Sequence, residues 1–211
     1  MHYTHDRNER QRNPGQINTR NLPYLPEMGI DKFLLMREYL SARGLDYTLA
    51  MHNGWYPVQH KGLRVFIPAV TRIPGHMYWQ ARSLDGNPLR YDSPFGPRRD
   101  ALVVVKGAVP CATVCVVEGP MDALAMAELT GVAGIALLGL SPPEEALAHL
   151  ASLCEEYQRV VCLPDKAEID GMMLIQNYLA NRAIRSTMKI PFDLKDIAEY
   201  TLRDRRLVLD D

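Results

Sequence analysis

The spacing of apolar residues divides the chain into two parts with different patterns. In the first part, helical spacing predicts a helix over residues 31–43, and a short helical piece is expected at 46–51, before the Asn53-Gly54 turn. The pattern then changes to strands separated by Pro-Gly and Asp-Gly-Asn turn signals. These strands are expected at residues 63–70, 76–83 and 88–93. Together they predict a small antiparallel meander.

From residue 101 onward, short apolar strands alternate with helices. The expected strands occupy residues 101–107, 112–119, 133–140, 159–165 and 186–192. The expected helices occupy residues 121–131, 142–156, 171–182 and 195–204. Strands that are apolar on both faces and are followed by helices typically form a parallel sheet covered by those helices. We therefore expect an α/β fold, with a mainly parallel sheet and flanking helices preceded by a small α+β subdomain.

Pro94, Gly96 and Pro97 mark a boundary between the two patterns. The predicted organisation is a flexible basic arm at 1–22, an N-terminal α+β subdomain at 23–100 and the mainly parallel domain at 101–211. The arm carries four arginines among Asn, Gln, Pro and Gly residues. Either a solvated tail or a contact with a nucleic-acid backbone would explain this composition.

Composition narrows the class of protein only slightly. The 211 residues include 24 Lys+Arg and 25 Asp+Glu, a balance that excludes binding by bulk positive charge but permits a local basic patch. No apolar run approaches the roughly 20 residues of a membrane span, and the N-terminus lacks the apolar core of a secretory signal. The cysteines have no zinc-site spacing, so we expect no zinc and four reduced, buried thiols in a cytoplasmic protein. These residues are Cys111, Cys115, Cys154 and Cys162.

Acidic residues follow the carboxyl ends of three expected strands. Glu118 and Asp165 each end an apolar strand, Asp196 follows the last strand, and Asp122 lies four residues after Glu118 in a first helical turn. Any single acid is explained by the polarity of loops. Three strand ends of a parallel sheet meet at one edge, however, and carboxylates gathered there repel each other unless a cation binds them. Oxygen ligands suit Mg²⁺ or Mn²⁺, which favours phosphoryl-transfer or phosphodiester chemistry.

The segment Val-Glu-Gly-Pro-Met-Asp at 117–122, in its strand–helix context, resembles the TOPRIM domain of bacterial and phage primases. Asp165, Gly171 and the Leu-Lys-Asp-Ile-Ala-Glu-Tyr segment at 194–200 follow in the order of that family. Short pieces of the first half, such as Arg90-Tyr91-x-Ser93-Pro94, are similar to the basic subdomain that precedes TOPRIM in these primases. The resemblance covers residues 30–205.

This resemblance implies metal-dependent synthesis of short RNA primers on single-stranded DNA, in the cytoplasm of a bacterial host. Glu118 would act as an acid–base residue or organise the metal site, while Asp165 and Asp196 would bind Mg²⁺ or Mn²⁺, with Asp122 in support. Contacts with the template or with nucleoside triphosphates are implied for Arg64, Arg82, Arg90, Lys106 and Lys195. Each arginine taken alone is equally well explained as a strand residue that covers apolar neighbours. A separate helicase or zinc-module protein is a further implied partner.

Two acids of the family pattern are absent from this chain. Ala167 and Ala198 stand where acids are expected, so that Glu168 or Asp170 would have to serve as a substitute metal ligand. Lys166 would compete with a cation beside Asp165, which predicts a weakened metal site. No zinc module or helicase segment accompanies the matched region, which is typical of compact phage relatives.

Three functions therefore stay open. The first is a phage-type primase, the second a catalytically degenerate TOPRIM protein that binds DNA or a replication or host protein, and the third a TOPRIM nuclease. Aromatic residues do not decide between them. Trp55, Tyr56 and Trp79 could stack on bases, but large aromatic residues are more typical of a packed core.

Overall fold

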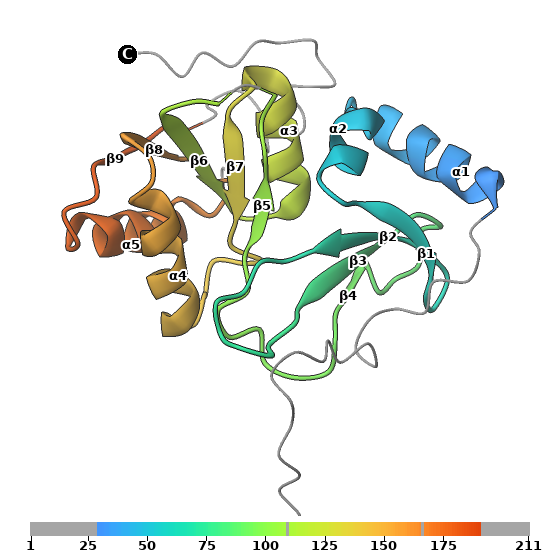
Figure 1. Ribbon diagram of the computed structural model, residues 1–211, viewed down its shortest axis with the longest axis horizontal. Coiled ribbons are helices and arrows are strands. Elements are labelled where there is room, and N and C mark those ends of the chain that lie inside the picture. Colours follow the sequence, from blue (N-terminus) through green and yellow to red (C-terminus); the bar gives the residue numbers. More distant parts are fainter. Residues whose placement is uncertain (1–28, 109, 166, 191–211) are drawn as a thin grey trace, which may run out of the picture.

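In the computed structural model, the chain forms two sheets that lie beside each other, with helices packed against both (Figure 1). The structure describes residues 29–190, apart from Val109 and Lys166. The elements follow the chain as α1 (Ile30–Ser41), α2 (Tyr47–His52), β1 (Tyr56–Gln59), β2 (Leu63–Pro68), β3 (Trp79–Ser83), β4 (Tyr91–Asp92), β5 (Val103–Val105), β6 (Thr113–Val117), α3 (Pro120–Thr130), β7 (Ala133–Ala136), α4 (Glu144–Cys154), β8 (Arg159–Cys162), α5 (Ile169–Ala180) and β9 (Ser186–Met188).

The first sheet is an antiparallel meander in the order β1-β2-β3-β4, as the strand pattern predicts. Strand β1 is an addition to the prediction. Its four residues include Pro57 and show no alternation of buried and exposed positions, so the two usual signals of a strand are absent. The strand forms because β2 supplies a complete antiparallel partner, with Val58 opposite Arg64.

The second sheet has the order β5-β7-β6-β8-β9 and confirms the mainly parallel α/β fold. Strand β6 lies at its centre and pairs in parallel with β7 and β8, and β9 extends the parallel part beyond β8. Only β5 runs antiparallel, against β7. Helix α3 covers one face, while α4 and α5 cover the other (Figure 1).

The face that α3 covers shares one apolar core with the N-terminal helices. Met36 and Leu40 of α1 belong to the same buried cluster as Leu124 of α3. Close packing of α3 on the sheet depends on Gly134 in β7, where a Cβ atom would lie 2.7 Å from the Ala123 carbonyl oxygen. The meander is thus packed against the parallel sheet through α1, α2 and α3.

The cysteines are free, and the prediction that all four are buried is wrong for one of them. Cys111 is exposed, because it lies in the connection before β6 and not in the strand. Burial raises the pKa of Cys115, Cys154 and Cys162 to about 12, so these thiols stay protonated at neutral pH.

Several predictions fall outside the described residues. These are the arm at 1–22, the helix at 195–204 and the site residues Lys195 and Asp196. Among the helices that the structure describes, none combines the length and hydropathy needed to cross a membrane.

Candidate functional site

The carboxyl ends of β6, β7 and β8 meet at one edge of the parallel sheet, the lower edge in Figure 1. Glu118 is the first residue after β6, and Asp165 follows β8 by three residues. The carbonyl oxygen of Glu118 accepts hydrogen bonds from the N–H groups of Leu138 and Gly139, at 2.9 and 3.4 Å. The segments that leave β6 and β7 are therefore bound to each other beside the Glu118 side chain.

Glu118 has an unfavourable electrostatic environment for a carboxylate. Burial raises the pKa of this half-buried side chain, and the charges of Asp165 and Glu168 raise it further. Asp170 is not among the charges that act on Glu118, and it is exposed in the first turn of α5. Of the two predicted substitute acids, Glu168 is therefore the one whose charge reaches the centre of this edge.

A tight turn after β8 explains why Glu168 reaches this edge. The N–H of Glu168 donates to the carbonyl of Asp165 at 2.9 Å, and the Glu168 carbonyl accepts from Met172 at 3.2 Å. Glu168 is thus both the end of the turn and the N-cap residue of α5. The turn keeps the backbone of Glu168 close to that of Asp165, and the charges of both residues act on Glu118.

Asp122 lies beside the turn that follows β6 and also acts on a residue of the meander. It lies in the first turn of α3, and its carboxylate lies against Gly119, where a Cβ atom would stand 2.9 Å from Oδ2. Burial raises the pKa of Tyr91 in β4; Arg82 partly offsets this, and Asp122 raises the pKa again. Asp122 is therefore an electrostatic neighbour of Tyr91, and its membership of the site around Glu118, which the four-residue spacing indicates, stays a prediction.

The described part of the predicted metal site is incomplete. Across residues 29–190, with 109 and 166 left out, no group of three or more His, Cys, Asp or Glu side chains is arranged to hold a metal ion. Glu118, Asp165 and Glu168 are electrostatic neighbours, and the further predicted ligand Asp196 is outside the described range. Their carboxylate oxygens have the chemistry that Mg²⁺ or Mn²⁺ requires.

Arg64 is a structural residue of the meander. Its side chain is fully buried, and its guanidinium donates to four backbone carbonyls at 2.8–3.3 Å. The acceptors are His60, Lys61, Ala81 and Leu89. Because these N–H groups are directed at the backbone, Arg64 does not present them to a phosphate. The structure therefore assigns Arg64 a role in folding in place of the expected contact with template or triphosphate.

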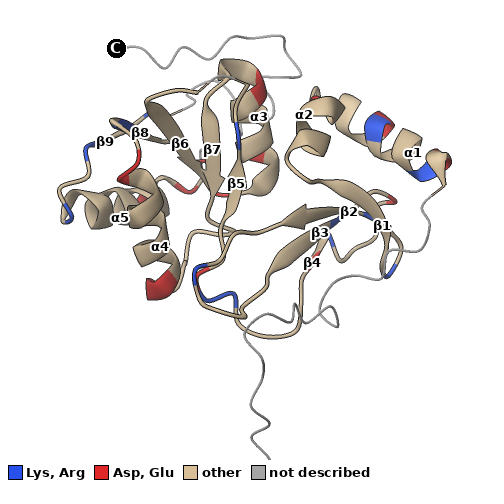
Figure 2. Cartoon of the chain, in the orientation of Figure 1, with Lys and Arg blue, Asp and Glu red and all other residues tan. Residues whose placement is uncertain are grey.

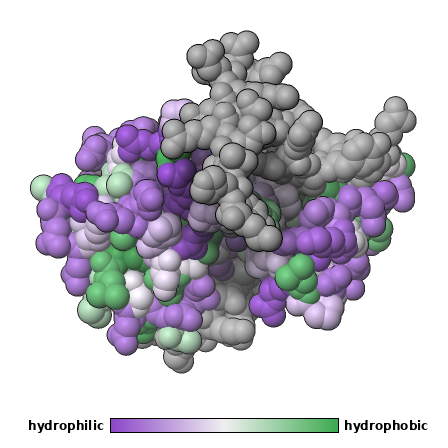
Figure 3. Space-filling model, turned by 90° about the horizontal axis from the view of Figure 1, so that it is seen from below, coloured by the Kyte–Doolittle hydropathy of each residue, from purple (hydrophilic) through white to green (hydrophobic). Residues whose placement is uncertain are grey.

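The other predicted basic residues differ in how accessible they are. Arg82 is buried, donates from Nε to the Tyr39 hydroxyl at 2.9 Å and lies 4.7 Å from the centroid of the Tyr91 ring. Arg90 and Lys106 are exposed. Lys106 follows β5, which runs antiparallel to β7, so it lies at the opposite end of the sheet from Glu118, where its N–H donates to the Asn53 side chain at 2.7 Å. The described part of the surface below the strand ends is mainly hydrophilic, with smaller hydrophobic patches (Figure 3).

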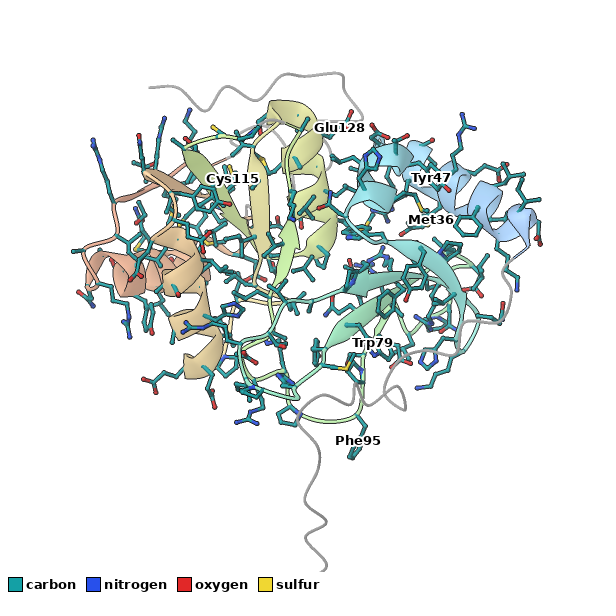
Figure 4. The ribbon with its side chains drawn as sticks, in the orientation of Figure 1. Met36, Tyr47, Trp79, Phe95, Cys115 and Glu128 are labelled. Atoms are coloured by element: carbon teal, nitrogen blue, oxygen red, sulfur yellow. The ribbon has the colours of Figure 1, made fainter. Side chains whose placement is uncertain are left out.

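The two tryptophans belong to the core. Trp55 and Trp79 are buried, as the core interpretation predicts, and Tyr56 is half-buried and stacks on Phe66 with ring centroids 4.7 Å apart. Phe95 behaves differently, since it is fully exposed and projects from the foot of the molecule (Figure 4).

Arg98 is a residue near the site that sequence reasoning misses. Its guanidinium donates to the carbonyls of Leu138 and Ser141, in the loop that leaves β7. Figure 2 shows basic and acidic residues together in the connection that leads into β5. The only signal in the sequence is an arginine pair after Pro97, which is equally typical of a solvated loop.

Comparison with known proteins gives a fold but no sequence family. No family model and no curated protein sequence matches the chain. The E. coli primase catalytic core aligns with a TM-score of 0.61 over 82% of this chain and 70% of that one, at 16% identity. The primase fragment of the bacteriophage T7 primase-helicase protein aligns with a TM-score of 0.57 over 78% and 69%, at 17% identity. The DnaG primase catalytic domain bound to ssDNA gives 0.57 over 81% and 68%, at 18% identity. The chain thus has the fold of a primase catalytic core.

Proposed function

We propose that the chain is a phage-type primase that joins nucleotides into short RNA primers on single-stranded DNA. The observation that carries this proposal is the half-buried Glu118 at the central strand end of a primase-core fold, where burial raises its pKa and the charges of Asp165 and Glu168 raise it further. Like charges gathered at a strand edge oppose folding, so their presence favours a ligand that uses them. In this proposal the parallel sheet is a TOPRIM domain.

The proposed cation is Mg²⁺ or Mn²⁺, held by Glu118, Asp165 and Asp196, with Glu168 in place of the acid that the family has two residues after Asp165. Such a cation, when bound, reduces the charge repulsion between a triphosphate and an attacking hydroxyl. The raised pKa of Glu118 suits a group that accepts a proton near neutral pH. Arg90, which is exposed, supplies positive charge for the triphosphate or the template.

The full chain tests this proposal directly. Incubated with the four ribonucleoside triphosphates, single-stranded DNA and either Mg²⁺ or Mn²⁺, it should produce short RNAs whose appearance requires template, nucleotides and metal together. Absence of RNA product with both metals, over a set of templates of mixed sequence, would contradict the proposal. A parallel reaction without nucleotides examines the nuclease alternative, which predicts cleavage of the DNA.

A catalytically degenerate protein is the second candidate function. It is favoured by the lack of a three-residue metal group within the described range and by alanine at two expected acidic positions, Ala167 and Ala198. The two candidates differ in their response to metal. A protein that only binds DNA should be stabilised against heat by single-stranded DNA but not by Mg²⁺. The primase should be stabilised against heat by Mg²⁺ even when no DNA is present.

A further inference from the structure

Arg98 binds the loop that leaves β7 at two points. Its Nη1 donates to the carbonyl of Leu138, and its Nη2 donates to the carbonyl of Ser141 at 2.8 Å. The guanidinium is half-buried and planar, so two hydrogen bonds from it fix the orientation of the loop as well as its position. A lysine could supply the charge at this place but not the forked pair of donors.

The loop that Arg98 binds is attached to Glu118. The N–H groups of Leu138 and Gly139 donate to the Glu118 carbonyl, at 2.9 and 3.4 Å. The peptide group that joins Leu138 to Gly139 therefore connects Arg98 with Glu118, because its carbonyl accepts from the Arg98 guanidinium and its N–H donates to the Glu118 carbonyl. A change at Arg98 reaches Glu118 through two hydrogen bonds.

The backbone of this loop needs such support. Leu138 has φ +62°, in the left-handed region that a branched side chain rarely adopts. In the connection that carries Arg98, the next residue, Arg99, also has a positive φ, of +49°. Conformations of this kind persist only where surrounding contacts hold them. The Arg98 hydrogen bond to the Leu138 carbonyl is one such contact.

The backbone that carries Arg98 is held in place by Asp100, a buried residue two positions further along the chain. Asp100 accepts a hydrogen bond from the backbone of Arg72 and pairs with the His76 ring at 2.7 Å, while its carbonyl contacts His149 of α4 at 2.7 Å. The connection that carries Arg98 is thus tied to the meander on one side and to α4 on the other.

From these contacts we infer that Arg98 is a positioning residue for Glu118, which it serves by holding the Leu138–Ser141 loop in place and Leu138 in its left-handed conformation. This role links the meander to the acidic edge of the parallel sheet. The reaction that it serves rests on the proposed function, but the structural part of the inference does not.

Amide hydrogen exchange in the full chain tests the structural part, with Arg98→Lys as the variant and Arg99→Lys as the matched control. Arg98→Lys keeps the charge but loses the fork, so exchange at Leu138 and Gly139 should become about tenfold faster or more, since hydrogen bonds from charged groups are among the stronger ones. Arg99 is exposed, and its replacement should leave both amides unchanged. Exchange at the wild-type rate in Arg98→Lys would overturn the inference.

Primer synthesis provides the second readout. Misplacement of Glu118 should lower kcat by about tenfold in Arg98→Lys, with little change in KM for the nucleotides, because positioning affects the reacting geometry. A raised KM with unchanged kcat would instead show that Arg98 binds nucleotide, and it would overturn the positioning role. If the wild type makes no primers, the proposed function fails, while the exchange measurement still decides the role of Arg98.

Discussion

The arginines of the meander and the carboxylates of the parallel sheet are charged groups used in opposite ways. Arg64 and Arg82 are buried among partners from their own subdomain, namely backbone carbonyls, a tyrosine hydroxyl and a tyrosine ring. Glu118 instead has carboxylates as electrostatic neighbours, and their charge acts against its own. A charge matched inside the chain stabilises the fold, whereas like charges held together point to a ligand from outside.

The contrast between paired arginines and gathered carboxylates predicts that the largest effect on primer synthesis comes from a change at Asp165. Replacement by Asn should reduce primer synthesis by about 100-fold or more, because a metal-site carboxylate acts on the reacting groups. Asp170→Asn is the matched control, since Asp170 is exposed and does not act on Glu118; its rate should stay within about twofold of wild type. Equal losses in the two variants would contradict the claim that Asp165 belongs to the site around Glu118 and that Asp170 does not.

Among the charged residues that stabilise the fold, Arg64 should have the largest effect on the free energy of unfolding. Arg64→Met leaves four carbonyl contacts unmade, one buried and three partly buried, and should lower the free energy of unfolding by about 3 kcal/mol or more. Arg90→Met, at an exposed position, should change it by no more than about 0.5 kcal/mol. Denaturant unfolding of both variants measures the difference, and similar stabilities would remove the contrast between buried and exposed arginines.

A smaller effect is expected at Asp100, where the sign of the pH dependence is specific. Burial would raise the pKa of Asp100, but hydrogen bonds from His76 and from the backbone of Arg72 and Ile73 outweigh it, so the pKa is lowered. A lowered carboxyl pKa adds stability above its ordinary value, and this stability is lost as pH falls through the folded-state pKa.

Asp100→Asn should therefore cost about 2 kcal/mol at neutral pH, and the difference from wild type should shrink below about pH 4. Thermal or denaturant unfolding over a pH series provides the measurement. If the difference in stability between Asp100→Asn and wild type did not depend on pH, the charge of Asp100 would not be what stabilises this connection.

The smallest expected effect is that of metal on stability. The raised pKa of Glu118 means that its charge opposes folding as pH rises through that pKa, so a bound cation should help more at high pH. Saturating Mg²⁺ should raise Tm by about 2 °C at pH 7.5 and by less at pH 5. An equal rise in Glu118→Gln would place the cation elsewhere.

Much of this fold can be predicted from the sequence because its signals are local. The alternation of apolar strands with helices predicts the parallel sheet and places Glu118 and Asp165 at the carboxyl ends of its strands. That these two strands are neighbours is seen only in the structure. The TOPRIM resemblance adds the expectation of a primase, and the structural comparisons agree with it at the level of the fold.

What could not be predicted depends on contacts between distant residues. Arg64 is buried because carbonyls from three separate segments converge on it, which no local pattern reveals. Asp122 has the right spacing to join Glu118, but no local pattern predicts that its charge also acts on Tyr91 of the meander. Arg98 gains its role only because the β7 loop, some 40 residues further along the chain, turns back to meet it.

The most direct test of the account is Glu118→Gln, assayed for primer synthesis and for stability in the same preparation. We predict that RNA synthesis falls by at least about 100-fold, while the free energy of unfolding at neutral pH is unchanged or higher because carboxylate repulsion is removed. Full activity in Glu118→Gln, or a loss of activity explained by unfolding of the variant, would contradict the claim that this residue serves function and not the fold.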